Sequence, residues 1–369
     1  VLERICAVEK DLTILLLASS LTDYRRATQG WWDTIETHTD RGFLRYRPAY
    51  FVSSNLHSLV NLLTGYAWNG PGETRRFLET NNPEELWDIY ETLQDDPDHP
   101  EQYNLLYYAQ KFARPAEPAL RMWELESGIQ QIENPLYLDV AAQVIDLSQL
   151  RPERFDPRLR MEGLERLRRS NAVIFNVDYP LGMAAYQLLS QVTTSIGGIR
   201  GVYIVGKAAT LNARIGDVMI PNVVYDEHSK NTFLFRNAFT AEAVSPYLLY
   251  HTVFDNQKAV TVRGTILQNQ EFMGLFHNEG YTDIEMEAGP YLSAVYENIY
   301  PKRYPINEIV NLFINARYDI GILHYASDTP YSRRKALLSE SLSYRGVDAT
   351  YACSIAVLRR IFAQELGAR

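Results

Sequence analysis

Three clusters of residues have the types and spacing that chemistry on a small molecule requires. Residues 206–209 read Gly-Lys-Ala-Ala, where small side chains let the backbone approach a ligand and Lys207 supplies a positive charge. Residues 285–287 read Glu-Met-Glu and place two carboxylates at the start of a predicted helix, and Asp328 lies on a loop that ends at Pro330. Each cluster follows an apolar run, and α/β sheets bind ligands just beyond the carboxyl ends of their strands.

The elements that must position these clusters alternate between strand and helix. Short β-branched runs predict buried strands, and amphipathic stretches predict helices, one of them begun by a proline. We expect strands at 172–177, 202–205, 217–220, 259–265, 283–286 and 320–325, and helices at 161–169, 180–189, 270–277 and 288–298. This alternation predicts an α/β fold with a mostly parallel or mixed central sheet flanked by helices.

The chain before residue 135 has a different pattern. Apolar residues recur at helical spacing over 9–26, and Pro83 follows two asparagines as a helix start would. The 369 residues are long enough for two or three units. We therefore expect a largely helical N-terminal region of unknown role over 1–135, followed by an α/β domain over 136–369.

Four motifs in order carry a resemblance to a known family. Residues 178–185 read Asp-Tyr-Pro-Leu-Gly-Met-Ala-Ala, and the small-residue loop at 206–209 precedes Gly-Asp-Val-Met-Ile-Pro at 216–221. Glu-Met-Glu-Ala at 285–288 and Ser-Asp at 327–328 complete the set. From about 171 to 365 the chain resembles the nucleoside phosphorylase and nucleosidase superfamily, which includes purine and uridine phosphorylases and AMP nucleosidase-like proteins. The resemblance implies cleavage of the N-glycosidic bond of a nucleoside or nucleotide, and a homo-oligomer (dimer, trimer or hexamer).

The resemblance also assigns the sugar and the leaving base to particular residues. Glu287, with Met286 and Glu285, would bind the ribose, because a carboxylate offers several acceptor sites to a vicinal diol. Asp328 would be the catalytic acid at the departing base, since a carboxylic acid whose pKa is raised by burial can supply a proton.

The resemblance assigns binding of the base edges and of phosphate to other residues. Gln268 and Asn269 would bind the base through their amides, and Gly206 and Lys207 would bind phosphate. The family's phosphorylases commonly have an arginine just before this loop, where this chain has Tyr-Ile-Val at 203–205. Inorganic phosphate as co-substrate, water as nucleophile and a phosphate carried by the substrate therefore all stay open, and no other cofactor is implied.

Each of these residues also has a plain structural interpretation. Glu285 and Glu287 are alternatively caps of the following helix. Asp328 before a Thr-Pro pair is alternatively a turn former, and Lys207 a partner in a structural ion pair. His324 lies within an apolar strand, where a hydrogen-bonded core histidine is the preferred interpretation.

Residues 45–58 form a conspicuous polar stretch in the N-terminal region. Serine and asparagine before an apolar run predict helix capping, and His57 and Asn61 are one turn apart on one face. The alternative is an anion at this helix start, with Arg45 or Arg47 nearby. Capping is the preferred interpretation.

The composition limits the classes of partner and the location that we expect for this chain. The net charge is −9 with a pI of about 5.4, and no dense run of lysine and arginine stands out, which argues against a nucleic-acid partner. The two cysteines, Cys6 and Cys353, lack metal-ligand spacing, so we expect no metal and a reducing, cytoplasmic location. No apolar run has the length of a membrane span, so we expect no membrane partner.

Two other classes of function compete with an enzyme. One is a nucleoside- or nucleotide-binding sensor that has lost turnover. The altered phosphate loop, which lacks the family's arginine, is the reason to consider it. The other is a structural, oligomeric scaffold that uses the same fold. Three acids at strand ends argue against the scaffold, because such charges are costly without a ligand or a partner charge.

Overall fold

A mixed β-sheet runs through the centre of the computed structural model, which describes residues 21–40, 42–70, 72–96, 99–113, 117–132, 137–264, 270–300, 311–329 and 344–367. Within these ranges eleven strands form one sheet in the order β10-β7-β6-β8-β9-β5-β1-β4-β3-β2, with β11 paired to β5 and β6. The strands are β1 (Ala49–Ser54), β2 (Ile129–Ile132), β3 (Ala142–Asp146), β4 (Val173–Asp178), β5 (Ile199–Thr210), β6 (Val218–Asp226), β7 (Asn231–Phe235), β8 (Val253–Thr261), β9 (Asp283–Glu285), β10 (Asn311–Ile314) and β11 (Asp319–Asp328).

The parallel part of the sheet sets where the candidate residues meet. β1 pairs in parallel with β4 and β5, and β11 pairs in parallel with β5. β5 is twelve residues long and at its far end also pairs antiparallel with β9. The carboxyl ends of β1, β4, β5 and β11 therefore lie at one edge of the sheet.

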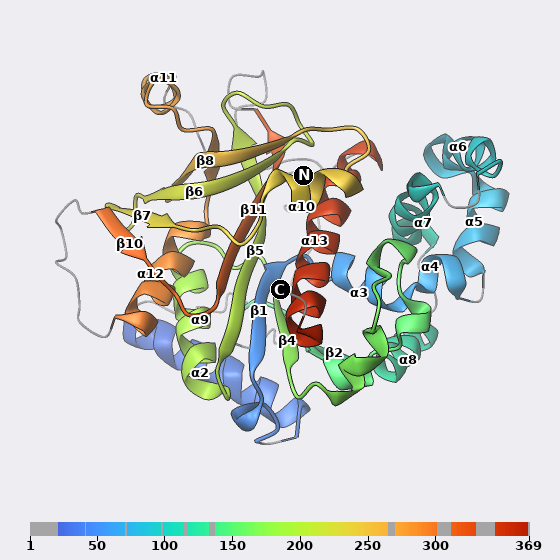
Figure 1. Cartoon of the computed structure of the whole chain (residues 1–369), viewed down its shortest axis with the longest axis horizontal. Helices are drawn as coiled ribbons and strands as arrows, with labels where there is room; N and C mark the ends of the chain where they lie inside the picture. Colours follow the sequence, from blue (N-terminus) through green and yellow to red (C-terminus); the bar gives the residue numbers. More distant parts are fainter. Residues whose placement is uncertain are drawn as a thin grey trace, which may run out of the picture.

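Helices cover both faces of this sheet (Figure 1). One face packs against α2 (Leu21–His38), α9 (Met183–Ser195) and α12 (Ala288–Ile299). The other packs against α3 (Ser58–Thr64), α7 (Pro100–Ala113) and α13 (Val347–Leu366). The remaining helices are α4 (Tyr66–Asn69), α5 (Glu73–Asn81), α6 (Leu86–Leu93), α8 (Glu117–Glu126), α10 (Ala241–Val244) and α11 (Gln270–Asn278), with short 3-10 turns between elements.

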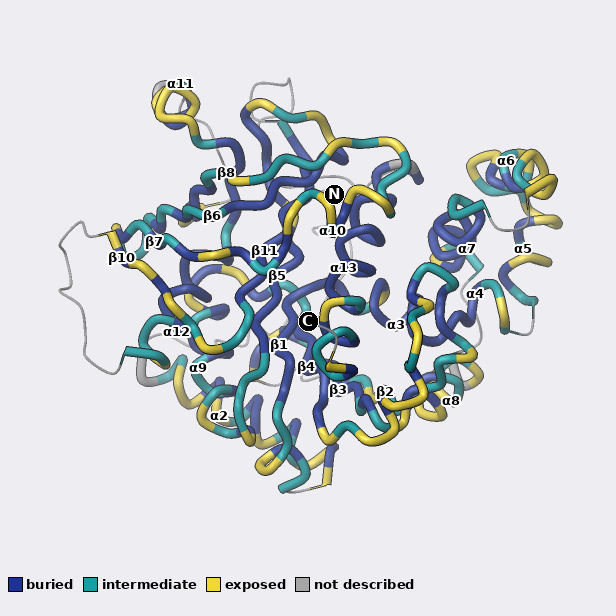
Figure 2. Tube along the Cα trace, viewed as in Figure 1, coloured by how far each residue is buried: buried dark blue, intermediate teal, exposed yellow. Residues whose placement is uncertain are grey.

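Burial follows this layering. Figure 2 shows the central strands as largely buried, while α5 and α6 expose many of their residues. On the α2 face Trp31 is fully buried, its indole donates to the Val140 carbonyl at 2.7 Å, and its ring meets Phe175 edge-on. On the α13 face Phe155 stacks on Phe362. Apolar burial on both faces is the main stabilising contribution in such a layered fold.

The α/β fold class predicted from the sequence is confirmed, with a mixed rather than mostly parallel sheet. The six predicted strands all occur, and the predicted helices at 270–277 and 288–298 correspond to α11 and α12. The helix predicted from Pro180 begins at Met183, after Gly182 at a φ of 56°. The stretch at 161–169 forms a 3-10 turn over Leu164–Arg169 in place of the predicted α-helix.

The region before residue 135 is largely helical but also supplies two strands. β1 lies between β4 and β5, and β2 forms an outer strand beside β3. The sheet therefore takes strands from both sides of the predicted boundary at 135. The first part of the helix predicted over 9–26 lies outside the described residues, and α2 begins at Leu21. Among the described helices none combines the length and apolarity that a membrane crossing needs.

Candidate functional site

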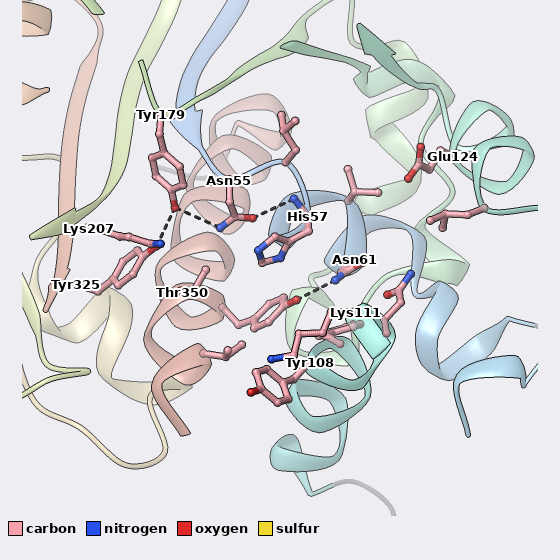
Figure 3. A pocket seen from close by; sticks show the side chains of 17 residues that line it. Asn55, His57, Asn61, Tyr108, Lys111, Glu124, Tyr179, Lys207, Tyr325 and Thr350 are labelled. Carbon is pink, nitrogen blue, oxygen red and sulfur yellow. Dashed lines mark hydrogen bonds between the residues drawn. The ribbon is translucent and has the colours of Figure 1, made fainter. Parts of the chain in front are cut away.

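A cavity of about 430 Å³ lies at the carboxyl edge of the parallel strands (Figure 3). Its sheet side is formed by Asn55 after β1, Tyr179 after β4, Lys207 on β5 and Tyr325 on β11. Its other walls come from α3, α7, α8 and α13, which contribute His57, Asn61, Tyr107, Tyr108, Lys111, Glu124, Thr350 and Tyr351 among others. The helical N-terminal region therefore closes the edge where an α/β sheet binds its ligand.

Two tyrosine hydroxyls meet at the sheet side of this cavity. The Oη atoms of Tyr179 and Tyr325 are 2.8 Å apart, and the Asn55 amide donates to the Tyr179 hydroxyl at 3.4 Å. Burial raises the pKa of Tyr179 to about 12, so its hydroxyl stays protonated at neutral pH. Tyr179 also has a φ of 37°, which is strained for a bulky side chain. Strain of this kind is concentrated at functional sites.

Lys207 is exposed and points into this cavity with the two tyrosines (Figure 3). It makes no ion pair within 4 Å among the residues that the structure describes. Its charge acts on a neighbour, because burial raises the pKa of Asp178 and Lys207 opposes that rise. An unpaired ammonium in a concave site is available to an anionic ligand.

The start of α3 is capped from within the protein. The Asn55 side-chain oxygen accepts hydrogen bonds from the backbone N–H groups of His57 at 3.0 Å and Ser58 at 2.7 Å. Capping, the preferred interpretation of this stretch, is therefore confirmed. The alternative with a basic partner is wrong, because Arg45 and Arg47 precede β1 and lie at the opposite edge of the sheet, where Arg47 forms a 2.7 Å ion pair with Asp146.

A buried ionic network holds the helical wall of the cavity. Tyr107 on α7 donates to Asp156 at 2.8 Å, and Asp156 pairs with Arg158 at 2.7 Å. Arg158 donates to Asn104 on α7, whose amide in turn donates to Asp348 on α13 at 3.1 Å. The wall formed by α7 and α13 is therefore positioned by specific bonds as well as by apolar packing.

A second group of charged side chains lies behind β5, which we name the acid cluster: Asp283, Glu285, Glu287 and His324. His324 bonds to Asp283 through Nδ1, while its Nε2 has no hydrogen-bond partner in the described structure. All four are buried, with Glu287 the most accessible at 4% exposed. The preferred interpretation of His324 as a hydrogen-bonded core histidine is confirmed for Nδ1 but not for Nε2. No group in the described chain has the arrangement of a metal site.

Burial and charge shift two of these groups strongly. Burial, reinforced by the neighbouring Glu285, raises the pKa of Glu287 to about 8. For His324 burial favours the neutral ring, but the Asp283 carboxylate outweighs it and raises the pKa to about 8. At neutral pH Glu287 is therefore mostly a neutral carboxylic acid, and His324 mostly a cation.

The two predicted ribose-binding carboxylates have different environments. Glu285 accepts from the backbone N–H of Glu287 at 2.6 Å and of Ala288 at 2.7 Å, and from the Thr261 hydroxyl. It therefore caps α12, as the structural alternative expected, while the ribose role of Glu285 stays a prediction. The Oε2 of Glu287 accepts from the Met286 N–H at 3.1 Å, and it lies 3.9 Å from where a Cβ added to Gly206 would stand, beside the ring of His324. Met286 is half-buried between them.

The end of β5 brings the other predicted residues together. Ala209 on β5 pairs with Asp328 of β11 on one side and with Ile284, next to Glu285, on the other. Asp328 is 6% exposed, and its carboxylate accepts from the Thr329 N–H at 2.8 Å, as a turn former would. Lys207, Glu287 and Asp328 thus surround one strand end, although of the three only Lys207 lines the 430 Å³ cavity.

Two predicted residues cannot be placed, and several were missed. Gln268 and Asn269, the predicted base-binding pair, lie outside the described residues. The tyrosines of the cavity were not singled out, because they come from segments far apart in the sequence. Two signals were available: Tyr179 lies in the motif at 178–185, and the tyrosine content is high, 25 residues, which is typical of half-buried pockets.

The chain belongs to the family described as "Family of unknown function (DUF6909)", which matches residues 1–363. No curated protein matches this chain.

Solved structures similar to this chain include nucleoside-processing enzymes. One is a methylthioadenosine phosphorylase from an Antarctic soil metagenomic library, at 10% identity over 64% of this chain and 79% of that chain, with a TM-score of 0.39. Another is the 5′-methylthioadenosine/S-adenosylhomocysteine nucleosidase of Neisseria meningitidis in complex with methylthio-immucillin-A, at 11% identity over 67% and 93%, with a TM-score of 0.39. Similarity at this level shows nothing about the activity of this chain.

Proposed function

We propose that this protein binds a nucleoside or nucleotide at the carboxyl edge of its sheet and cleaves the N-glycosidic bond, by phosphorolysis or hydrolysis. The observation that carries the proposal is the grouping at the end of β5. Lys207 points into an aromatic cavity, the Glu287 carboxyl lies beside Gly206, and Asp328 pairs with the same strand.

The chemistry assigns one task to each group. A protonated Glu287 carboxyl both donates and accepts a hydrogen bond, which suits a pair of ribose hydroxyls. As the bond between C1′ and the base nitrogen breaks, its electron pair leaves with the base, and Asp328 donates a proton to that base. Water or phosphate then forms the new C1′–O bond as positive charge develops on the sugar, and with water as nucleophile the proton that it loses returns to the Asp328 carboxylate. The tyrosines supply flat apolar surface for the base.

The test is release of free base from a panel of nucleosides and nucleotides, with and without phosphate. We expect Asp328→Asn to lower the rate at least about 100-fold, because general acid catalysis contributes on that order. Asparagine keeps an acceptor for the Thr329 N–H, so the turn is preserved. Asp33→Asn, at an exposed position on α2, is the matched control and should leave the rate unchanged. Equal rates in wild type and Asp328→Asn would remove Asp328 from the mechanism.

A binding sensor without turnover is the second candidate, and one observation favours it. The described lining of the cavity contains lysines, tyrosines and amides, and its carboxylate is Glu124 on α8, far in sequence from Glu287 and Asp328. A sensor predicts saturable binding of nucleotides with no free base from any substrate, and the same panel separates the two functions.

A further inference from the structure

A second cavity lies at the opposite edge of the sheet, where β1, β5 and β11 begin. It has a volume of about 980 Å³, and its wall includes Tyr50 on β1, Tyr318 before β11 and the last turns of α13. The charged residues of this wall are five arginines and two carboxylates: Arg166, Arg169, Arg200, Arg317, Arg360, Asp319 and Glu365. We name this cavity the arginine cleft.

Two of the five arginines are neutralised within the protein. Arg200 pairs with Glu365, and Arg360 pairs with Asp319 at 2.6 Å. The other three, Arg166, Arg169 and Arg317, are exposed and have no carboxylate partner among the described residues. Three guanidinium groups without a described carboxylate partner thus gather in one concavity of a chain whose net charge is −9. Like charges held together in this way repel one another, and a bound anion removes that repulsion.

The arginine cleft is separate from the cavity at the carboxyl edge. Arg200 and Lys207 are seven positions apart on β5, which corresponds to about 23 Å along a strand. α13 reaches both sites, with Tyr351 in the first cavity and Arg360 in the cleft. A ligand in the cleft therefore does not touch the proposed catalytic residues, although it contacts two elements that position them.

We propose that the arginine cleft binds a small molecule that carries several phosphate groups. A guanidinium presents a planar fork of donors that matches phosphate oxygens, and it keeps its charge at any physiological pH. Three unpaired arginines call for a ligand with at least as many negative charges, which a single phosphate does not supply. The volume lies within the range of small-molecule sites. An extended nucleic acid does not fit the acidic net charge of the whole chain.

The test is calorimetric titration of the full chain with inorganic tripolyphosphate, and with orthophosphate at the same ionic strength. We expect saturable binding of tripolyphosphate and weaker binding of orthophosphate. Arg169→Gln and Arg317→Gln should each weaken tripolyphosphate binding roughly fivefold or more, since charge-assisted hydrogen bonds are lost. Arg168→Gln is the matched control, because Arg168 is exposed on the same 3-10 turn as Arg169 but does not line the cleft.

Several outcomes would overturn the proposal. One is no saturable binding of tripolyphosphate, and another is an equal loss in Arg168→Gln, which would show nonspecific attraction to surface charge. Loss of tripolyphosphate binding in Lys207→Met, with binding unchanged in Arg169→Gln and Arg317→Gln, would place the anion in the first cavity. Binding of a polyglutamate peptide in place of tripolyphosphate would make the cleft a surface for an acidic protein segment. The titration measures binding and not turnover, so its result does not depend on whether the protein releases free base from any substrate.

Discussion

His324 and Tyr325 are neighbours on β11, yet their side chains belong to two regions with different chemistry. His324 turns to the acid cluster and pairs with Asp283, where every group is buried. Tyr325 turns to the opposite face and bonds to Tyr179 in the cavity (Figure 3). The alternation of side chains along a strand separates the two regions by a single residue.

The contrast shows what each region does. In the acid cluster Asp283 and His324 pair in the buried interior, so changes to these two residues should alter the stability of the fold first. In the cavity Lys207 is exposed and without a carboxylate partner in the described chain, so changes there should alter ligand binding first. If this division between the two regions holds, the largest effect should follow a change at His324.

Replacing His324 with leucine should destabilise the protein by about 3–5 kcal/mol, because Asp283 would be left as a buried carboxylate without its cationic partner. Denaturant unfolding, followed by circular dichroism, measures the change. A loss below about 1 kcal/mol would mean that the acid cluster is open to water and that the division between the regions is wrong.

The acid cluster should also make stability depend on pH. Glu287 and His324 both have a pKa of about 8 in the folded protein, above their ordinary values of 4.5 and 6.5, so the folded state holds more protons. Their contribution to the free energy of unfolding is complete at low pH and is lost as pH rises through 8. The slope is at most about 1.4 kcal/mol per pH unit for each group.

Denaturation midpoints at pH 6.5, 7.3 and 8.5 measure this effect. Glu287→Gln, which stays neutral at every pH, should show a shallower fall than wild type. Carboxylates with a lowered pKa, such as Asp226, titrate below this window and do not interfere. A stability that rises over the same interval would contradict the charge assignment of the acid cluster.

In the cavity, Lys207→Met should weaken binding of a nucleoside monophosphate about tenfold, or about 1.4 kcal/mol, by removing an unpaired positive charge. Binding of the corresponding nucleoside, which has no phosphate, should change little, and so should the free energy of unfolding. Lys230→Met in the loop between β6 and β7 is the matched control. Equal weakening for nucleoside and monophosphate would place the phosphate away from Lys207.

The smallest effect is expected for Tyr325→Phe. Loss of one hydroxyl leaves Tyr179 with the bond from Asn55, so destabilisation should be about 1 kcal/mol. Since Tyr325 and His324 are adjacent on one strand, this variant is also the control for His324→Leu. A larger loss for Tyr325→Phe than for His324→Leu would reverse the comparison of the two regions.

The sequence predicted much of the α/β part, because its strands and helices follow local rules. The apolar runs at 202–205 and 320–325 were long enough to mark β5 and β11, and the Glu-Met-Glu motif marked the start of α12. β1 was missed because Ala49–Ser54 is a short apolar run inside a helical region, where periodicity does not distinguish strand from buried helix. Its place beside β4 and β5 depends on contacts more than 100 residues away.

By itself the sequence determined the fold class, the capping of α3 by Asn55 and the order of polar clusters at strand ends, since all three depend on neighbouring residues in the chain. Only the tertiary structure decided that Glu285 caps α12 while Glu287 lies beside Gly206, and that α7 closes the cavity. These outcomes depend on which distant segments pack together, because burial and partner charges come from groups that are not neighbours in sequence.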